Sequence, residues 1–382
     1  MAITGVGHSP VYRRPEVPLG PLTLDACRTA VADAGLTADR IDGVACAPRQ
    51  PVPGRDVTYD GVDHVTADFV AGHLGLATTW RENVGGFLMN SLVAAVSAVG
   101  SGLCDHVLVC RSLHGPRARY GVRADAGAPG PAQFDAPYGI FVPGVWAQQW
   151  QRYQHLYGTG SREEMAALVV RARANGLLWE HGYWTARGAA PLTVEEYLGA
   201  RMISTPLCVH DCDIPVHGAA AFVVSGTGHH DLPHPPAYVR GLAPAVHAEG
   251  NTLRPWPLEQ EQEAGRAVAR TLWRRSGFGP ADVDLANLYD GFGIIAVVWL
   301  EAFGFCGPGE AFGYLAADPV PLNTSGGNLG AGRMHGVPHL MDAVLQVTGR
   351  SGPRQVPGAE LALVSIGQQS GGGALLLGAT PD

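Results

Sequence analysis

The chain has 382 residues, of which 46% are hydrophobic and 16% are charged, and its formal net charge is −8. This length and composition predict two core-sized units or one large duplicated domain, and they exclude a disordered protein. No basic run is present to pair with phosphates and no stretch of 18 uncharged apolar residues is present, so we expect neither a nucleic-acid partner nor a membrane span.

The chain has seven cysteines, an odd number, and none of them has the spacing of a zinc ribbon. Cys208 and Cys212, with His210 and Asp211 between them, come nearest to a metal-ligand pair. We expect reduced thiols and no metal site. The N-terminal segment MAITGVGHSP lacks the basic and apolar regions of a signal peptide, which favours a cytoplasmic protein.

Strand and helix patterns alternate in the first part of the chain. The predicted strands are residues 2–7, 41–48 and 105–114, and the predicted helices are residues 22–35 and 86–102. The second helix carries many small and apolar residues, which suits a helix that is buried on most sides. The β-α-β-α-β succession predicts a parallel sheet with helices on both faces.

Residues 115–160 interrupt this alternation, and their length indicates a functional excursion rather than an ordinary connection. Trp146, Trp150, Tyr153 and Tyr157 recur at the spacing of one helix face. We interpret this face as core or subunit interface in preference to a substrate wall. Further helices are predicted at 161–177 and 193–203, followed by a strand at 217–226.

The pattern restarts after a polar Gly/His/Pro cluster at residues 226–236. The predicted strands are 238–246, 284–290 and 360–366, with a last one in GGGALLLG, and the predicted helices are 259–276, 291–304 and 333–350. Two successive halves of similar order suggest an internal duplication. We place the halves at 1–233 and 234–382, with an inserted loop and helix region at about 115–204.

Four stretches now suggest a family. They are ENVGGFLMNSLVAAVSAVGSGLCDHVLV (82–109), MISTPLCVHDCDIPVHGAAAFVVS (202–225), NLYDGFG (287–293) and PLNTSGGNLGAGRMHG (321–336). Together they resemble the thiolase superfamily, and more narrowly the sterol-carrier-protein-type thiolases and lipid-transfer acyl-CoA proteins of actinobacteria. The resemblance implies an α/β thiolase fold, in which two similar βαβαβ halves pack as a layered α/β/α/β/α core.

The chain departs from the thiolase pattern at each catalytic position. Gly86, or Gly85, stands where the nucleophilic cysteine would begin the buried helix. The two usual histidines are replaced by Tyr289 and Arg333, and the late cysteine position falls near Gly367. Covalent acyl-enzyme chemistry is therefore not expected.

The segments YDGF and GRMHG resemble the steroid side-chain-cleaving aldolases, which lack the cysteine. This resemblance implies a cysteine-independent carbon–carbon lyase that performs a retro-aldol or aldol reaction on a β-hydroxyacyl-CoA. Such aldolases are expected to carry a second catalytic tyrosine shortly after the His-Gly pair, where this chain has Val337, Pro338 and His339. Two alternatives stay open: a Claisen-type acyltransferase, and a non-catalytic subunit that binds acyl-CoA or lipid.

A retro-aldol reaction needs a base for the β-hydroxyl proton, donors for the enolate oxygen and an acid for its carbon. Tyr289 is the candidate acid or base, with a structural phenol as the alternative, and His335 is the best remaining imidazole. Asp290 would orient a partner or cap a helix, and Asn323 would position a water or the thioester oxygen. The remaining candidates, for the substrate or an oxyanion hole, are Gly85, Gly86, Gly327, Arg333 and His339.

The resemblance also implies partners. A homodimer is expected, together with a small OB-fold protein that carries a zinc finger, in a heterotetramer. The CoA thioester would be the substrate and no bound cofactor is expected, because GGFLMNS lacks a phosphate-loop lysine and GVGHSP is too short for a dinucleotide fingerprint.

Overall fold

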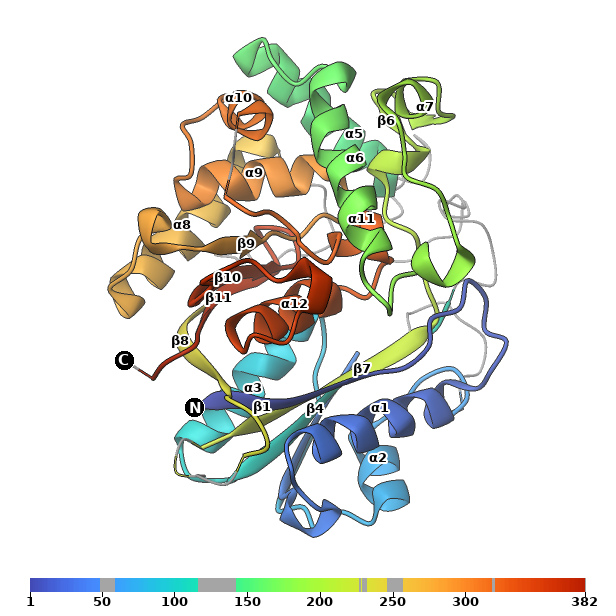
Figure 1. Cartoon of the computed structure of the whole chain (residues 1–382), viewed down its shortest axis with the longest axis vertical. Helices are drawn as coiled ribbons and strands as arrows, with labels where there is room; N and C mark the ends of the chain where they lie inside the picture. The colour runs from blue at the N-terminus through green and yellow to red at the C-terminus, as the bar shows by residue number, and fades with distance from the viewer. Residues whose placement is uncertain are drawn as a thin grey trace.

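The computed structural model describes residues 1–48, 59–115, 142–226, 228, 232–245, 257–317 and 320–381. The first part of the predicted excursion, residues 116–141, lies outside this range. The described chain folds into alternating layers of helices and strands (Figure 1). None of the helices within the described ranges is long and apolar enough to span a membrane.

The first half contributes five strands of a mixed sheet. In order across the sheet they are β3 (Trp80–Asn83), β2 (Gly43–Ala47), β4 (His106–Leu113), β7 (Gly218–Ser225) and β1 (Ala2–His8). The expected parallel arrangement holds for β2 with its neighbours β3 and β4. In contrast, β7 is antiparallel to both β4 and β1, because the chain leaves β4 and enters β7 at the same end of the sheet.

The second half repeats this order of pairing. Its strands are β8 (Ala237–Pro244), β11 (Gly373–Gly378), β10 (Leu361–Ile366) and β9 (Leu285–Asn287). The parallel, antiparallel, antiparallel succession of β9, β10, β11 and β8 matches that of β2, β4, β7 and β1. Two residue pairs between β1 and β8 join the halves edge to edge, Ala2 with Tyr238 and Ile3 with Ala237.

Six helices form the layers on and between the two groups of strands. They are α1 (Leu19–Asp33), α2 (Ala67–Leu74), α3 (Leu88–Gly100), α8 (Leu258–Ser276), α9 (Gly293–Phe303) and α12 (Val337–Val347). Apolar residues of α3 and α12 share one core with strands of both halves, so these two helices lie in the middle layer. The outer layers are α1 and α2 on one side and α8 and α9 on the other, seen at the bottom and top of Figure 1.

A helical region covers the second half beside α9. It comprises α5 (Val142–Tyr157), α6 (Arg162–Leu177), α7 (Val194–Leu198), α10 (Ala311–Ala316), α11 (Gly327–Ala331) and the small hairpin β5 (Met202–Ser204) and β6 (Leu207–Cys208). The interpretation of the α5 aromatic face as core is confirmed, because Trp150 and Tyr153 are fully buried and Trp146 stacks on Phe292 at 5.8 Å. The helix predicted at 193–203 is too long: α7 ends at Leu198, and the last two residues of the predicted helix begin β5.

The predicted helix at 333–350 begins four residues late, at Val337. His335 and Gly336 have φ angles of 51° and 100°, which a right-handed helix does not contain. This break separates α11 from α12 and places His335 at the turn between them.

Two cysteines differ from the prediction of reduced thiols. Cys46 and Cys110 face each other in the register of β2 and β4, and the structure joins them by a disulfide. The other five, Cys27, Cys104, Cys208, Cys212 and Cys306, are free.

Candidate active site

Tyr289 lies at the junction between β9 and α9, as its sequence position predicts. Its side chain is buried, and its backbone N–H donates to Ser365 Oγ on β10 at 2.9 Å. One side of the phenol ring packs against His339, with ring centres 5.8 Å apart. On another side the edge of Phe87, at the start of α3, contacts it at 5.6 Å.

His335 reaches the same place from the second half. Its ring also contacts Phe87 at 5.6 Å, so Phe87 bridges the imidazole and the phenol. Arg111, on β4, donates from Nη2 to His335 Nδ1 at 2.5 Å and from Nη1 to the carbonyl oxygen of Gly86 at 2.6 Å. The ring of Phe87 therefore contacts both Tyr289 and His335, and the guanidinium of Arg111 bonds to both His335 and Gly86.

The charge state of this group follows from its burial. Burial lowers the pKa of Arg111 to about 10, with Tyr289 opposing the shift, so the guanidinium stays charged at neutral pH. Burial, together with Arg111 and Arg333, holds the pKa of His335 well below its ordinary value. The imidazole is neutral, and because an arginine can only donate, Nδ1 accepts and the ring proton is on Nε2. His335 is thus a neutral hydrogen-bond donor.

Gly85 and Gly86 lie just before α3, where the sequence predicted a helix start. Among the residues that the structure describes, no acceptor contacts their N–H groups, which remain available to an oxyanion. Gly86 has a φ of 86°, and a Cβ there would stand 2.6 Å from Asn90 Nδ2. A side chain is therefore disfavoured at the position where a thiolase would carry its nucleophile.

Gly86→Cys is expected to give no acyl-enzyme and to destabilise the fold by about 1–3 kcal/mol, because its backbone conformation is unfavourable for any side chain. The measurements are intact-protein mass after incubation with an acyl-CoA and thermal unfolding. Gly86→Ala is the control, with the same strain and no thiol. A stable acyl adduct on the introduced thiol would contradict the expectation.

The free thiols do not supply a substitute nucleophile. Burial raises the pKa of Cys27 and Cys306 to about 12 and that of Cys208 to about 11. Burial also raises the pKa values of Cys104 and Cys212. All five are therefore protonated at neutral pH, whereas thioester attack requires a thiolate.

Asp290 caps a helix, although not the one that follows it in sequence. Its fully buried carboxylate accepts from the N–H groups of Asn328 at 2.6 Å and Leu329 at 3.4 Å, in α11. It also accepts from His339 Nε2 at 3.0 Å. His339, which we considered as a substitute for the second tyrosine, is thus bonded to Asp290 behind Tyr289 and orients the phenol by stacking on it.

Gly327→Ala is expected to destabilise the protein by about 1–3 kcal/mol and to lower activity. Gly327 has a φ of 59°, and a Cβ there would lie 2.2 Å from Asp290 Oδ2, so alanine displaces the carboxylate that holds His339. Denaturant unfolding and steady-state kinetics measure the two effects. Gly358→Ala, with a φ of 70° and open space around its Cβ, is the control for backbone strain alone.

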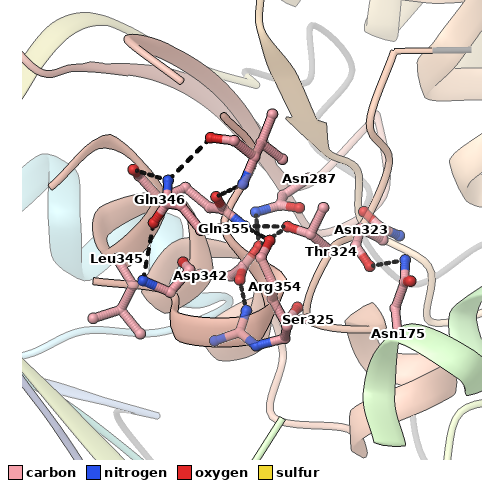
Figure 2. A network of polar contacts seen from close by, with 12 residues as sticks. Asn175, Asn287, Asn323, Thr324, Ser325, Asp342, Leu345, Gln346, Arg354 and Gln355 are labelled. Carbon is pink, nitrogen blue, oxygen red and sulfur yellow. Dashed lines mark hydrogen bonds and ion pairs between the residues drawn. The ribbon is translucent and has the colours of Figure 1, made fainter. Parts of the chain in front are cut away.

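Asn323 lies behind the Tyr289 turn rather than beside the phenol ring. Its amide pairs with the backbone of Leu288, accepting from the N–H at 2.6 Å and donating to the carbonyl oxygen at 2.9 Å. Asn175, on α6, donates to the Asn323 carbonyl oxygen at 3.0 Å, as Figure 2 shows. In this arrangement Asn323 fixes the residue that precedes Tyr289.

A buried polar network supports the Asn323 loop and α12 from behind (Figure 2). Asp342, fully buried on α12, accepts from Arg354, Thr324 and Asn287. Gln346 then connects Thr324 to the carbonyl oxygen of Arg354, at 3.1 and 2.7 Å. The sequence analysis missed this network, because its members are spread over β9, a loop and a helix.

Asp213 is a further residue that the sequence analysis missed. Its side chain is only 2% exposed, and its Oδ1 lies 3.8 Å from Arg333 Nη1. Burial raises the pKa of Asp213 to about 7, Arg333 opposes the shift and Asp290 adds to it. The segment after β6 brings Asp213 here, because its N–H bonds to the Gly291 carbonyl oxygen and Ile214 accepts from the Arg333 N–H.

Comparisons with known proteins identify the family of the chain. Residues 257–376 match the family model "Thiolase C-terminal domain-like". The chain is 30% identical to the 17-hydroxy-3-oxo-4-pregnene-20-carboxyl-CoA lyase of Mycobacterium tuberculosis, over 99% of this chain and 98% of the relative. The chain belongs to the family of thiolase-like aldolases. A steroid side-chain-cleaving aldolase of Thermomonospora curvata is also 30% identical, over 99% of this chain and 97% of that one.

A solved structure of the same family has a similar fold. This structure, described as "Ltp2-ChsH2(DUF35) aldolase", superposes with a TM-score of 0.83 and 27% sequence identity, covering 99% of this chain and 97% of that one. The predicted thiolase fold and the resemblance to the aldolases are therefore confirmed.

Arg111 and Phe87 were not predicted as site residues, but a signal existed for one of them. Arg111 is the charged residue within the apolar strand β4, HVLVCRSL, and a buried arginine in a central strand needs a specific partner. Phe87 gives no such signal. A Cβ at Gly367 would lie 2.7 Å from its ring, so Phe87 packs against the position expected for the late thiolase cysteine.

Proposed function

We propose that this protein is a cysteine-independent carbon–carbon lyase that cleaves a β-hydroxyacyl-CoA by a retro-aldol reaction, or forms it by the reverse aldol addition. One observation carries this proposal. The phenol of Tyr289 and the neutral imidazole of His335 both contact Phe87, and the guanidinium of Arg111 bonds to His335. The protonated free thiols support chemistry without an acyl-enzyme.

In the proposed reaction the β-hydroxyl loses its proton to Tyr289, and the phenol gives up its own proton to a neighbouring acceptor, as the bond between the α and β carbons breaks. The β carbon leaves as a ketone or aldehyde, and the electron pair forms the enolate of the thioester. His335 Nε2–H and the N–H groups before α3 are the donors for the enolate oxygen. Protonation of the α carbon completes a shortened acyl-CoA. The guanidinium of Arg111 stabilises negative charge that develops on the phenol oxygen.

The substrate class and partners are taken from the relatives. The names of the two relatives describe a pregnene carboxyl-CoA and a steroid side chain, so we propose a bulky polycyclic acyl group on coenzyme A, with no bound cofactor. The solved neighbour is named as a complex of two components, which supports a partner protein for this chain. We propose that the chain forms a homodimer and that the partner is a small OB-fold zinc-finger protein in a heterotetramer. We place this activity in the cytoplasm.

The test is cleavage of a β-hydroxyacyl-CoA with a polycyclic substituent, by the protein alone and with an OB-fold partner. Mass spectrometry follows the carbonyl product and the shortened acyl-CoA. Formation of both products supports the lyase. Tight thioester binding without cleavage, with or without the partner, would instead indicate the binding subunit, and an acylated protein would indicate an acyltransferase.

A further inference from the structure

Gly291, two residues after Tyr289, lies next to both the phenol and a buried carboxylate. A Cβ built on Gly291 would stand 3.3 Å from both Tyr289 Oη and Asp213 Oδ2, and 2.9 Å from Tyr289 Cε1. The phenol oxygen and the carboxylate oxygen therefore both border the space that a side chain at position 291 would fill. They are within reach of each other directly or through one water molecule.

The carboxylate has few other partners. Among the described residues no hydrogen bond reaches Asp213 Oδ1, although this atom is buried. The groups that face it are Arg333 at 3.8 Å, Asp290, whose charge raises the pKa of Asp213, and Cys212, whose own pKa is raised. Such an incompletely paired carboxylate is costly to bury, and sites of this kind are concentrated where proton transfer occurs.

From this geometry we infer that Asp213 is the proton acceptor behind Tyr289, so that Tyr289, Gly291 and Asp213 form one proton relay. The inference rests on the proposed function. A neutral phenol can take the β-hydroxyl proton only if it gives up its own. In the relay the substrate O–H bond breaks as a new O–H bond forms on Tyr289, and the original phenol proton moves to Asp213. The proton returns along the same path or leaves to solvent after the carbon–carbon bond has broken.

The burial of Asp213 gives the relay a pH dependence. Its pKa is raised from 3.8 to about 7, so the carboxylate that can accept a proton is lost as the pH falls through about 7. Because the pKa of Asp213 is higher in the folded than in the unfolded protein, ionisation of this carboxyl group lowers the free energy of unfolding. This loss of stability grows between pH 4 and 7 and is fully present above pH 7. Asp213→Asn removes the acceptor and the cost together.

The first experiment compares Asp213→Asn with the wild type in the complete complex. The variant is expected to lose 10²-fold or more in kcat, to lose the acid limb of the pH profile near 7, and to melt at a higher temperature at pH 8. The matched control is Asp211→Asn, which removes a buried carboxylate bonded to Tyr197 and to the Cys208 N–H, and is expected to lower the melting temperature and keep the acid limb. Wild-type kcat and pH profile in Asp213→Asn would overturn the relay.

A second pair of variants tests whether the space beside Gly291 must stay free of a side chain. Gly291→Ala places a methyl group 3.3 Å from both oxygens and 2.9 Å from Tyr289 Cε1, which displaces the phenol, and is expected to lower kcat strongly with little change in KM. Gly293→Ala is the control, because its Cβ meets only the flexible side chains of Met165 and Leu168. Equal activity of the two variants would overturn the inference.

Infrared titration separates the relay from the proposed function. The protonated carboxyl band of Asp213, identified by its loss in Asp213→Asn, is expected to titrate near pH 7 and to shift its midpoint in Tyr289→Phe. A midpoint unchanged by Tyr289→Phe would overturn the coupling even if cleavage is observed. A shifted midpoint in a protein that cleaves no thioester would support the coupling and reject the proposed reaction.

Discussion

Tyr289→Phe is expected to lower the rate of β-hydroxyacyl-CoA cleavage by about 10²–10⁴-fold, the usual contribution of a positioned acid or base. The loss is expected in kcat rather than in KM, because the ring and its contacts with Phe87 and His339 remain. Stopped-flow or mass-spectrometric turnover of the complete complex measures it, with unfolding curves to show that the fold is intact.

The control for this variant is Tyr153→Phe. Tyr153 is a buried phenol on α5 that bonds to Glu301 near the C-terminal end of α9, so its replacement is expected to reduce stability without a comparable loss in kcat. Equal loss in the two variants would show that any buried phenol matters for activity. Full activity of Tyr289→Phe would remove the phenol from the mechanism.

Arg354→Met is expected to destabilise the protein by about 3–5 kcal/mol, the largest stability effect predicted for this chain. The guanidinium pairs with Asp342, and neither side chain exceeds 5% exposure. Methionine leaves the aspartate charge buried without its cation, and Asn287 and Thr324 can offset only part of the cost. Denaturant unfolding at constant pH gives the difference in free energy.

The matched control is Arg266→Met. Arg266 pairs with Glu263 one helical turn away, and both side chains are more than 40% exposed, so the change is expected to be small. A second comparison adds Asp342→Leu to Arg354→Met. The double variant no longer buries the unpaired Asp342 carboxylate, so it should recover part of the lost stability. A stability loss as small in Arg354→Met as in Arg266→Met would contradict the assignment of the network as buried support.

The sequence predicted most of the layered fold because strands such as β2, β4, β7 and β10 are buried along almost their whole length and the helices carry apolar faces. The strand at 105–114 and the helix at 259–276 agree with β4 and α8 to within a residue at each end. The hydrophobic pattern did not predict the elements correctly where a few residues interrupt the regular backbone. The turn at His335 depends on a positive φ, and the short α11 is held by a carboxylate from a different segment.

The candidate site was predictable only where one residue type is itself informative. Tyr289 was found because a phenol stands at a strand-to-helix junction, and His335 because an imidazole follows a glycine-rich motif; the structure places both against Phe87. The positions of Asn323 and His339 could not be derived in the same way. Both have polar groups suited to catalysis, but their partners, Leu288 and Asp290, were set by chain segments that meet only in the folded protein.

The edge-to-edge order of the strands also has a consequence during synthesis. β1 begins at Ala2 and pairs along its length with β7, which ends at Ser225. The N-terminal strand therefore emerges from the ribosome more than two hundred residues before its neighbour, a wait on the order of tens of seconds at about 5–20 residues per second. During that interval β1 lacks the neighbour that pairs with its backbone N–H and C=O groups, so it can pair with strands of other chains before β7 is made.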